Sequence, residues 1–278
     1  MKNHRVRKSI DAGITYFILL VVSLIFSFPV LWLLLASFSK TGSIYSFDGF
    51  FPAEYSLDSF RRLFTDTVLY NYPQWFKNTL FIAVLSSLIG TILVIMTAYT
   101  ISRFRFRGRK MLMKITLVLG MFPSFMAMTA VYILMTHFNL INQHWGLVLI
   151  YSAAAPVGYM VQKGFFDTIP GSIDEAARID GASSFTIFRK IIFPLSAPII
   201  VYTGLTLFAW PWSDFILPRL LLKDRDLYTV AVGLMSLGDD EFARFSAGAM
   251  FIAIPIIILY FCLARFLISG LSSGAVKE

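Results

Sequence analysis

The chain has 278 residues, of which 57% are hydrophobic and only 14% are charged, and its formal net charge is +8. A soluble globular domain is usually about 25% charged, so this composition excludes an ordinary soluble protein and predicts an integral membrane protein. The Lys and Arg residues lie in short segments that flank apolar runs, which argues against a nucleic-acid partner. The single cysteine, Cys262, excludes a disulfide within the chain.

Six apolar stretches are long enough to cross the roughly 30 Å hydrocarbon core of a bilayer as helices. They cover residues 14–37, 77–101, 111–136, 146–163, 196–218 and 248–269. The first stretch follows basic residues, as a signal peptide does, but it exceeds the usual 7–15 or so apolar residues and is interpreted as a retained span. We therefore expect an all-α membrane protein with one transmembrane domain over residues 1–278.

Prolines within or at the ends of these stretches each remove a backbone hydrogen bond and predict kinks or breaks. These prolines are Pro29, Pro123, Pro156, Pro211, Pro218 and Pro255. Bent helices favour a transporter or channel over a rigid anchor. Trp75 and Trp145 open the second and fourth stretches, where an amphipathic ring is typical of the membrane interface.

The distribution of basic residues predicts the orientation. With the N-terminus inside, the inside segments hold 14 Lys and Arg residues and the outside segments hold 7. Both termini are therefore expected in the cytoplasm. The strongest signal is the run at 103–110 (RFRFRGRK), which is interpreted as a basic loop beside the bilayer and not as a nucleic-acid patch.

A polar insert at 164–195 separates the fourth and fifth stretches. Ser172 and Glu175 have the S-x-x-E spacing of a capping box, which predicts a helix from about Ile173. Gly181 is expected to end this helix in a left-handed turn.

A second short helix is expected from Ser184 to Phe193, with Phe185, Phe188 and Ile192 on one face. Glu175 and Asp180 lie about 140° apart around a helix, so they do not converge as a catalytic carboxylate pair. From the residues alone, a surface linker and a docking element for a soluble subunit both remain open.

The run at 175–194 (EAARIDGASSFTIFRKIIFP) resembles the EAA loop of ABC importer permeases. Its Asp-Gly-Ala form, with FFDTIP at 165–170, is similar to the carbohydrate branch of that family. Segments 98–108 and 121–123 and the tail 270–278 are similar to other parts of maltose-type permeases. The segment 210–215 (WPWSDF) departs from a commoner Trp-Asn-x-Phe pattern, which leaves the role of Asp214 open.

The resemblance implies the type I ABC importer architecture of six transmembrane helices, with a cytoplasmic coupling helix within 164–195. It implies a homologous second permease, two ATPase subunits that hold ATP and Mg, and an extracytoplasmic solute-binding protein, all at a bacterial cytoplasmic membrane. The residues expected at the ATPase surface are Glu175, Ala176, Ala177, Asp180, Gly181, Ala182 and Phe185. The tail is expected either to reach the ATPases or to be disordered. The chain has no G-x-x-x-x-G-K-[ST] run, so we expect no catalytic activity and no cofactor in the chain itself.

The resemblance favours a maltodextrin-like oligosaccharide, and a galacto-oligosaccharide remains an alternative. Residues of a type suited to sugar contact are Asn78, Tyr132, Tyr151, Trp210, Trp212 and Asp214, although such side chains more often pack helices together. An ion-coupled secondary transporter would need buried carboxylates in paired broken helices, and intramembrane acids are nearly absent.

Two outer features complete the expectations. The long segment 38–76 is expected to contain folded structure that faces a partner. The acidic turn of Asp239, Asp240 and Glu241 is expected either to be solvated or to contact a binding protein. His137 and His144 flank a short outer loop without Cys or carboxylate companions, so no metal site is expected there.

Overall fold

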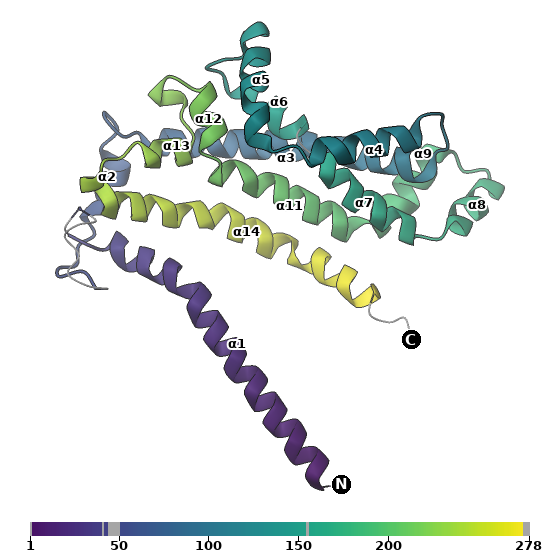
Figure 1. Ribbon diagram of the computed structural model, residues 1–278, viewed down its shortest axis with the longest axis horizontal. Helices are drawn as coiled ribbons and strands as arrows, with labels where there is room; N and C mark the ends of the chain where they lie inside the picture. The colour runs from purple at the N-terminus through teal and green to yellow at the C-terminus, as the bar shows by residue number, and fades with distance from the viewer. Residues whose placement is uncertain (1, 41, 44–50, 154–155, 275–278) are drawn as a thin grey trace. The chain divides into compact units, whose positions relative to one another are not determined.

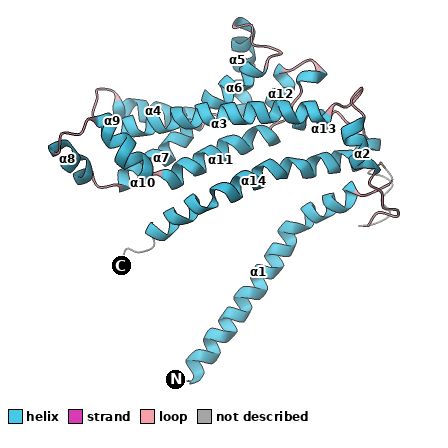
Figure 2. Ribbon diagram, turned by 180° about the vertical axis from the view of Figure 1, so that it is seen from behind, coloured by secondary structure: helices cyan, strands magenta, loops and turns pink. Residues whose placement is uncertain are grey.

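The computed structural model describes residues 2–40, 42–43, 51–153 and 156–274. Helices dominate its regular secondary structure (Figure 1; Figure 2), and one antiparallel bridge joins Ser39 to Tyr55. The elements are α1 (Lys2–Ser37), α2 (Asp58–Thr65), α3 (Tyr72–Arg103), α4 (Arg109–Gly120), α5 (Ser124–His137), α6 (His144–Ala153), α7 (Pro156–Thr168), α8 (Gly171–Ile179), α9 (Ser184–Ile187), the π-helix η2 (Phe188–Ile192), α10 (Phe193–Leu195), α11 (Ala197–Ser213), α12 (Ile216–Leu221), η3 (Arg225–Leu227), α13 (Val230–Met235), η4 (Asp239–Glu241) and α14 (Phe242–Gly274).

Three helical segments within the described ranges are individually long and apolar enough to cross a membrane: Ala12–Ser37, Tyr72–Arg103 and Asp239–Phe266. Three bent helix pairs raise this number to six if each pair forms one span. The six expected spans are thus the upper bound of what the described helices can provide.

One of the breaks lies at a proline that the sequence singled out. Arg109–Gly120 and Phe125–His137 meet at 105°, and Pro123 lies at this break as the residue that precedes α5. Ser184–Leu195 and Ala197–Ser213 meet at 77°. Pro29, Pro211 and Pro255 instead lie inside continuous helices.

The chain divides into two compact units, which are described separately. The first comprises Met1–Asn71 and Leu234–Phe251, and the second comprises Tyr72–Gly233 and Ile252–Glu278. In the first unit, α2 buries Leu63, and the rings of Phe38 and Phe60 lie 5.1 Å apart. The expectation of folded structure in the outer segment 38–76 is confirmed for α2 and for the bridge at Ser39.

The second unit is organised around α3, which packs against α6, α7 and α11. Small residues permit close approach of these helices: a Cβ on Gly90 would lie 2.9 Å from the Leu207 side chain and 3.5 Å from the Ser152 backbone. Ser87 of α3 donates a hydrogen bond to the backbone oxygen of Gly204 in α11 at 2.8 Å. Small residues and side-chain-to-backbone bonds are the usual means by which apolar helices associate in a membrane.

Candidate functional site

The first candidate site is the polar insert, which folds as α8, a turn, and the run from α9 to α10. Helix α8 begins at Gly171 directly after Pro170, whose backbone oxygen accepts from the Ile173 amide at 3.2 Å. No side chain caps this helix, so the predicted capping box of Ser172 and Glu175 is wrong. The proline already starts the helix, which places Ser172 inside the first turn and not before it.

The predicted left-handed end of α8 is confirmed. Gly181 has a φ of +81°, the Ala182 amide donates to the Ala177 oxygen at 2.9 Å, and the Gly181 amide donates to the Arg178 oxygen at 3.0 Å. These two bonds are those of a Schellman motif, which satisfies the last carbonyls of a helix. Ser183 then caps α9 by accepting from the Thr186 amide at 3.2 Å. Two fixed helix ends therefore define the geometry of the turn.

A buried ion pair anchors α8 to the end of α3. Asp174 is buried, and its Oδ2 lies 3.1 Å from Nε of Arg103. A second guanidinium nitrogen of Arg103 donates to the Ile169 oxygen at 2.9 Å, so this one side chain holds the end of α7 as well. Sequence reasoning missed both roles, because it counted Arg103 with the basic loop and Asp174 with the charges of the helix N-terminus. The one available signal for these roles was the position of Arg103, which is the residue of the basic run nearest to the end of the apolar stretch.

An apolar core lies beneath the insert. Its buried members come from α3, α7, α9 and η2, and they include Ile101, Phe166, Ile187 and Ile192. Tyr99 of α3 packs its ring 4.7 Å from that of Phe188. The insert is therefore packed onto α3 and does not hang from the bundle as a loose linker.

The expected helix from 184 to 193 forms, but its apolar face differs from the prediction. A π-helical turn at Phe188–Ile192 shifts the register, so Ile187 and Ile192 point into the core while Phe185 is 68% exposed. The α-helical spacing assumed for Phe185, Phe188 and Ile192 does not hold across a π-turn.

The outer face of the insert carries the residues expected at the ATPase surface. Glu175, Ala176, Asp180, Gly181 and Phe185 are exposed, whereas Ala177 and Ala182 are half-buried against the core. Ile179 was not among the expected residues, yet it is 87% exposed. The turn thus presents two large apolar side chains and an acidic residue on a rigidly held backbone, which is suited to docking a protein partner.

The second candidate site comprises the polar and aromatic residues of the helical bundle. Tyr151 of α6 donates a hydrogen bond to Oδ2 of Asp214 at 2.9 Å. The other carboxylate oxygen of Asp214 accepts from the Leu217 amide at 3.3 Å, at the start of α12. The structure therefore brings Tyr151 and Asp214 together where α11 ends and α12 begins.

Two other expected sugar-contact residues are buried. Asn78 is buried and donates to the backbone oxygens of Asp226 and Tyr228, at 2.7 and 3.0 Å. The ring of Trp212 is 1% exposed and packs edge-on against Phe76, with 5.0 Å between ring centroids. These contacts give both residues a packing role in the described chain.

The remaining aromatic residues lie elsewhere. Trp210 is exposed on α11, and Tyr132 is half-buried on α5. Trp145 is exposed, in keeping with an interfacial ring, whereas Trp75 is 1% exposed and donates to the Arg225 oxygen at 2.9 Å. The interfacial prediction for Trp75 is therefore wrong, because the ring instead stacks over Gly233, where an added Cβ would lie 2.0 Å from it.

Comparison with known proteins decides the family. Residues 90–273 match the family described as binding-protein-dependent transport system inner membrane component. The chain belongs to this family. Members are the permease subunits of ABC transporters and are not themselves enzymes, since ATP is hydrolysed by partner subunits.

Three relatives are similar to this permease over nearly their full lengths. The maltodextrin transport system permease protein MalD of Streptococcus pneumoniae is 34% identical over 98% of each chain. The galactooligosaccharides transport system permease protein GanQ of Bacillus subtilis is 36% identical, also over 98% of each chain. The maltodextrin transport system permease protein MdxG of Bacillus subtilis is 37% identical over 95% of each chain.

The fold of the permease is also similar to solved structures. A chain of a bacterial ABC transporter involved in the import of the acidic polysaccharide alginate aligns with a TM-score of 0.74 at 22% identity, covering 91% of this permease and 95% of that chain. A second structure is that of a bacterial alginate ABC transporter in complex with an alginate pentasaccharide-bound periplasmic protein. A chain of this structure aligns with a TM-score of 0.64 at 18% identity, covering 92% of this permease and 94% of that chain. Permease architecture is thus supported independently of sequence identity.

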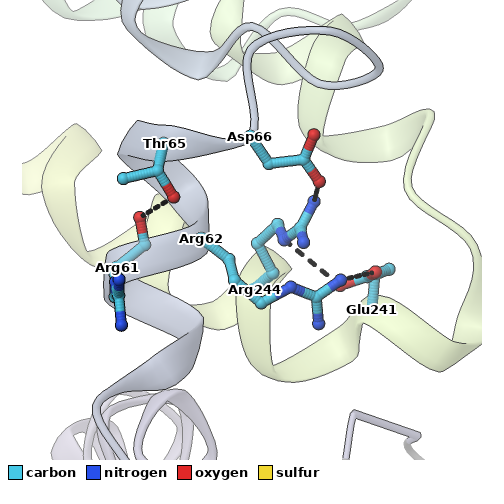
Figure 3. Close-up of polar contacts among 6 residues, drawn as sticks. All are labelled: Arg61, Arg62, Thr65, Asp66, Glu241 and Arg244. Carbon is cyan, nitrogen blue, oxygen red and sulfur yellow. Dashed lines mark hydrogen bonds and ion pairs between the residues drawn. The ribbon is translucent and has the colours of Figure 1, made fainter.

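In the acidic turn, Asp239 and Asp240 are exposed, whereas Glu241 is half-buried. Glu241 pairs with Arg62 of α2 at 2.8 Å and with Arg244 of α14 at 3.2 Å. Arg244 is fully buried and also pairs with Asp66 at 3.1 Å (Figure 3). The guanidinium further lies 5.3 Å from the ring centroid of Tyr70. This network joins α2 to the start of α14 within the first unit.

The loop histidines have structural surroundings. His144 Nε2 lies 2.9 Å from the Leu227 oxygen. In the described ranges, no group of three or more His, Cys, Asp or Glu residues is arranged to hold a metal ion.

Proposed function

We propose that this permease forms the translocation pathway of an ATP-driven oligosaccharide importer together with a homologous second permease. Two ATPase subunits that bind ATP and Mg dock on the exposed turn between α8 and α9, and an extracytoplasmic solute-binding protein delivers the sugar. The chain crosses the bacterial cytoplasmic membrane six times, with both termini in the cytoplasm. The single observation that carries the proposal is the rigid exposed turn, in a chain whose relatives over nearly full length are sugar permeases.

Force transfer through the turn follows from its construction. The Schellman bonds fix the backbone at Gly181, and the ion pair between Arg103 and Asp174 fixes α8 to α3. A partner seated on Glu175, Ile179 and Phe185 therefore moves the insert as a unit and not as a flexible loop. In this arrangement Glu175 faces a basic group of the ATPase, and Ala176 permits close approach.

A maltodextrin-like α-glucan is the proposed cargo, because two of the three relatives described above are maltodextrin permeases. A galacto-oligosaccharide is the alternative, since GanQ is similar to the same degree. Among the bundle residues, the Tyr151–Asp214 pair is the proposed sugar-contact site, with Trp210 beside it in sequence. Tyr132, Asn78 and Trp212 are assigned supporting roles in this pathway.

The coupling role is tested with Glu175→Ala in the assembled transporter. We expect lower ATPase co-purification and loss of sugar uptake, with normal insertion of the permease in the membrane. Asp239→Ala is the matched control for ATPase binding, because it removes another exposed acidic side chain on a different loop. Normal uptake and normal ATPase binding in Glu175→Ala would contradict the coupling assignment.

The cargo is tested by direct uptake. Uptake of labelled maltodextrin and of labelled galacto-oligosaccharide is measured separately in proteoliposomes with the cognate binding protein. Uptake of maltodextrin alone supports the α-glucan proposal, and uptake of galacto-oligosaccharide alone supports the alternative.

A further inference from the structure

Helix α3 holds an outer loop by buried side chains at its first turns. Four backbone groups of the loop 225–230 bind to it. Trp75 Nε1 donates to the Arg225 oxygen at 2.9 Å, Asn78 donates to the oxygens of Asp226 and Tyr228 at 2.7 and 3.0 Å, and the Val230 amide donates to Thr79 Oγ1 at 2.8 Å. Because these bonds go to backbone atoms, they fix the path of the loop whatever its side chains are.

The opposite end of α3 holds the insert in the same manner. Arg103 pairs with Asp174 of α8 at 3.1 Å and donates to the Ile169 oxygen at 2.9 Å. Ser102 donates to Oδ1 of Asp167 at 2.6 Å, and the Tyr99 hydroxyl donates to the Ser184 oxygen at 3.3 Å. The last turn of α3 is therefore tied to both the entry and the exit of α8.

Between these ends α3 is one uninterrupted helix. It runs for 32 residues, which corresponds to about 48 Å at 1.5 Å per residue. Its one proline, Pro73, lies in the first turn, where proline is tolerated. By contrast, α4 and α5 are broken at 105°, and the segment that leaves the insert is broken from α11 at 77°. Helix α3 contacts the insert at one end and the 225–230 loop at the other, with no break between them.

We infer that α3 transmits the movement of the coupling insert directly to the outer loop 225–230, with Arg103 and Asn78 as the positioning residues at its two ends. The inference rests on the proposed function, since it takes the insert to be the element that the ATPases move. The bonds of Asn78 to the Tyr228 oxygen and of the Val230 amide to Thr79 are buried, so breaking either one leaves a buried polar group without that partner, and this favours movement of helix and loop together. The outer loop then changes its environment when nucleotide binds on the other side of the membrane.

The test measures hydrogen exchange of the backbone amides of 225–232 in the assembled transporter, with and without ATP. We expect a nucleotide-dependent change in exchange for the unmodified protein and its loss in Arg103→Gln. The charge swap Arg103→Asp with Asp174→Arg is expected to restore the response. Arg105→Gln is the matched control, because it removes an exposed basic side chain from the same loop. A purely structural contribution of Arg103 would change exchange equally in both nucleotide states.

Thr79→Val supplies a second, nearly isosteric variant that removes the hydroxyl, which accepts from the Val230 amide and donates to the Trp75 oxygen one turn earlier in α3. We expect it to bind the ATPases normally and to show a weaker nucleotide response in 225–232. An unchanged response in Thr79→Val and Arg103→Gln, with the ATPases bound, overturns the inference and leaves the proposed function standing. If Arg103→Gln no longer binds the ATPases, the inference is judged on the nucleotide response of Thr79→Val alone. Normal ATPase binding and uptake in Glu175→Ala would overturn the proposed function instead.

Discussion

Replacement of Gly181 separates backbone conformation from side-chain volume at the proposed docking turn. Gly181 has a φ of +81°, and a Cβ built on it meets no atom within 4 Å. The whole penalty of a substitution is therefore conformational within the chain. The left-handed region costs an L-residue about 1–2 kcal/mol, least for Asn and most for a β-branched residue.

This penalty translates into a measurable weakening of docking. If the Schellman turn must be intact for the ATPase to bind, 1–2 kcal/mol corresponds to roughly 5–30-fold weaker binding. We expect the weakening of ATPase binding to lie at or beyond the upper end of that range for Gly181→Val and near its middle for Gly181→Ala. For Gly181→Asn we expect a weakening at or below the lower end. Gly171→Ala is the matched control, because Gly171 also has open space around it but no positive φ, so binding should be unchanged.

The assay is the affinity of the ATPase subunits for the purified permease pair in lipid nanodiscs, with sugar uptake in proteoliposomes as the functional readout. Equal losses in Gly181→Asn and Gly181→Val would refute the conformational reasoning and point to crowding at the docked surface. Unimpaired binding in Gly181→Val would show that the turn does not need this backbone conformation.

Two further predictions concern the buried polar groups. Arg244→Met should destabilise the permease by about 3–5 kcal/mol, because it leaves Asp66 and Glu241 without their buried partner. The control Arg61→Met, on the exposed face of α2, should change the stability by no more than about 0.5 kcal/mol. Both are measured by thermal denaturation in detergent, and similar melting temperatures for the two variants would contradict the assigned role of Arg244. Tyr151→Phe and Asp214→Ala should each lower sugar uptake, and the double variant should be no worse than the more impaired single variant, because each change removes the hydrogen bond between the two side chains. Additive losses would show that the two side chains act separately.

Local patterns in the sequence predicted a large part of the insert. The glycine after the polar helix predicted the left-handed turn at Gly181, and Pro123 predicted a broken third span, since both residues restrict the backbone at their own position. The capping-box prediction was wrong because the helix begins directly after a proline that lies two residues before Ser172. The prediction of the apolar face of the second helix was wrong because a π-turn changes the number of residues per turn on which the prediction relied.

The contacts that the sequence did not predict join residues far apart in the chain. Asn78 and Trp75 were interpreted by type, as a sugar contact and an interfacial ring, and they proved to bind the backbone of a loop about 150 residues away. Arg103 was counted as one positive charge among five, although its guanidinium holds two helix ends together. Glu241 was expected either to be solvated or to contact a binding protein, and in the structure it pairs with the buried Arg244.

By itself, the sequence determined that the chain is an integral membrane protein of helices, where its polar insert lies, and which family it resembles, because these properties depend on composition, apolar length and short motifs. Only the tertiary structure decided which polar side chains are tied up in the fold and which are presented to partners. A hydrogen bond or ion pair depends on where distant backbone segments pass, and one-dimensional spacing carries no information on that. For this reason the exposure of Ile179 at the proposed docking turn was found only in the structure, as were the internal contacts of Asn78, Asp174 and Arg103.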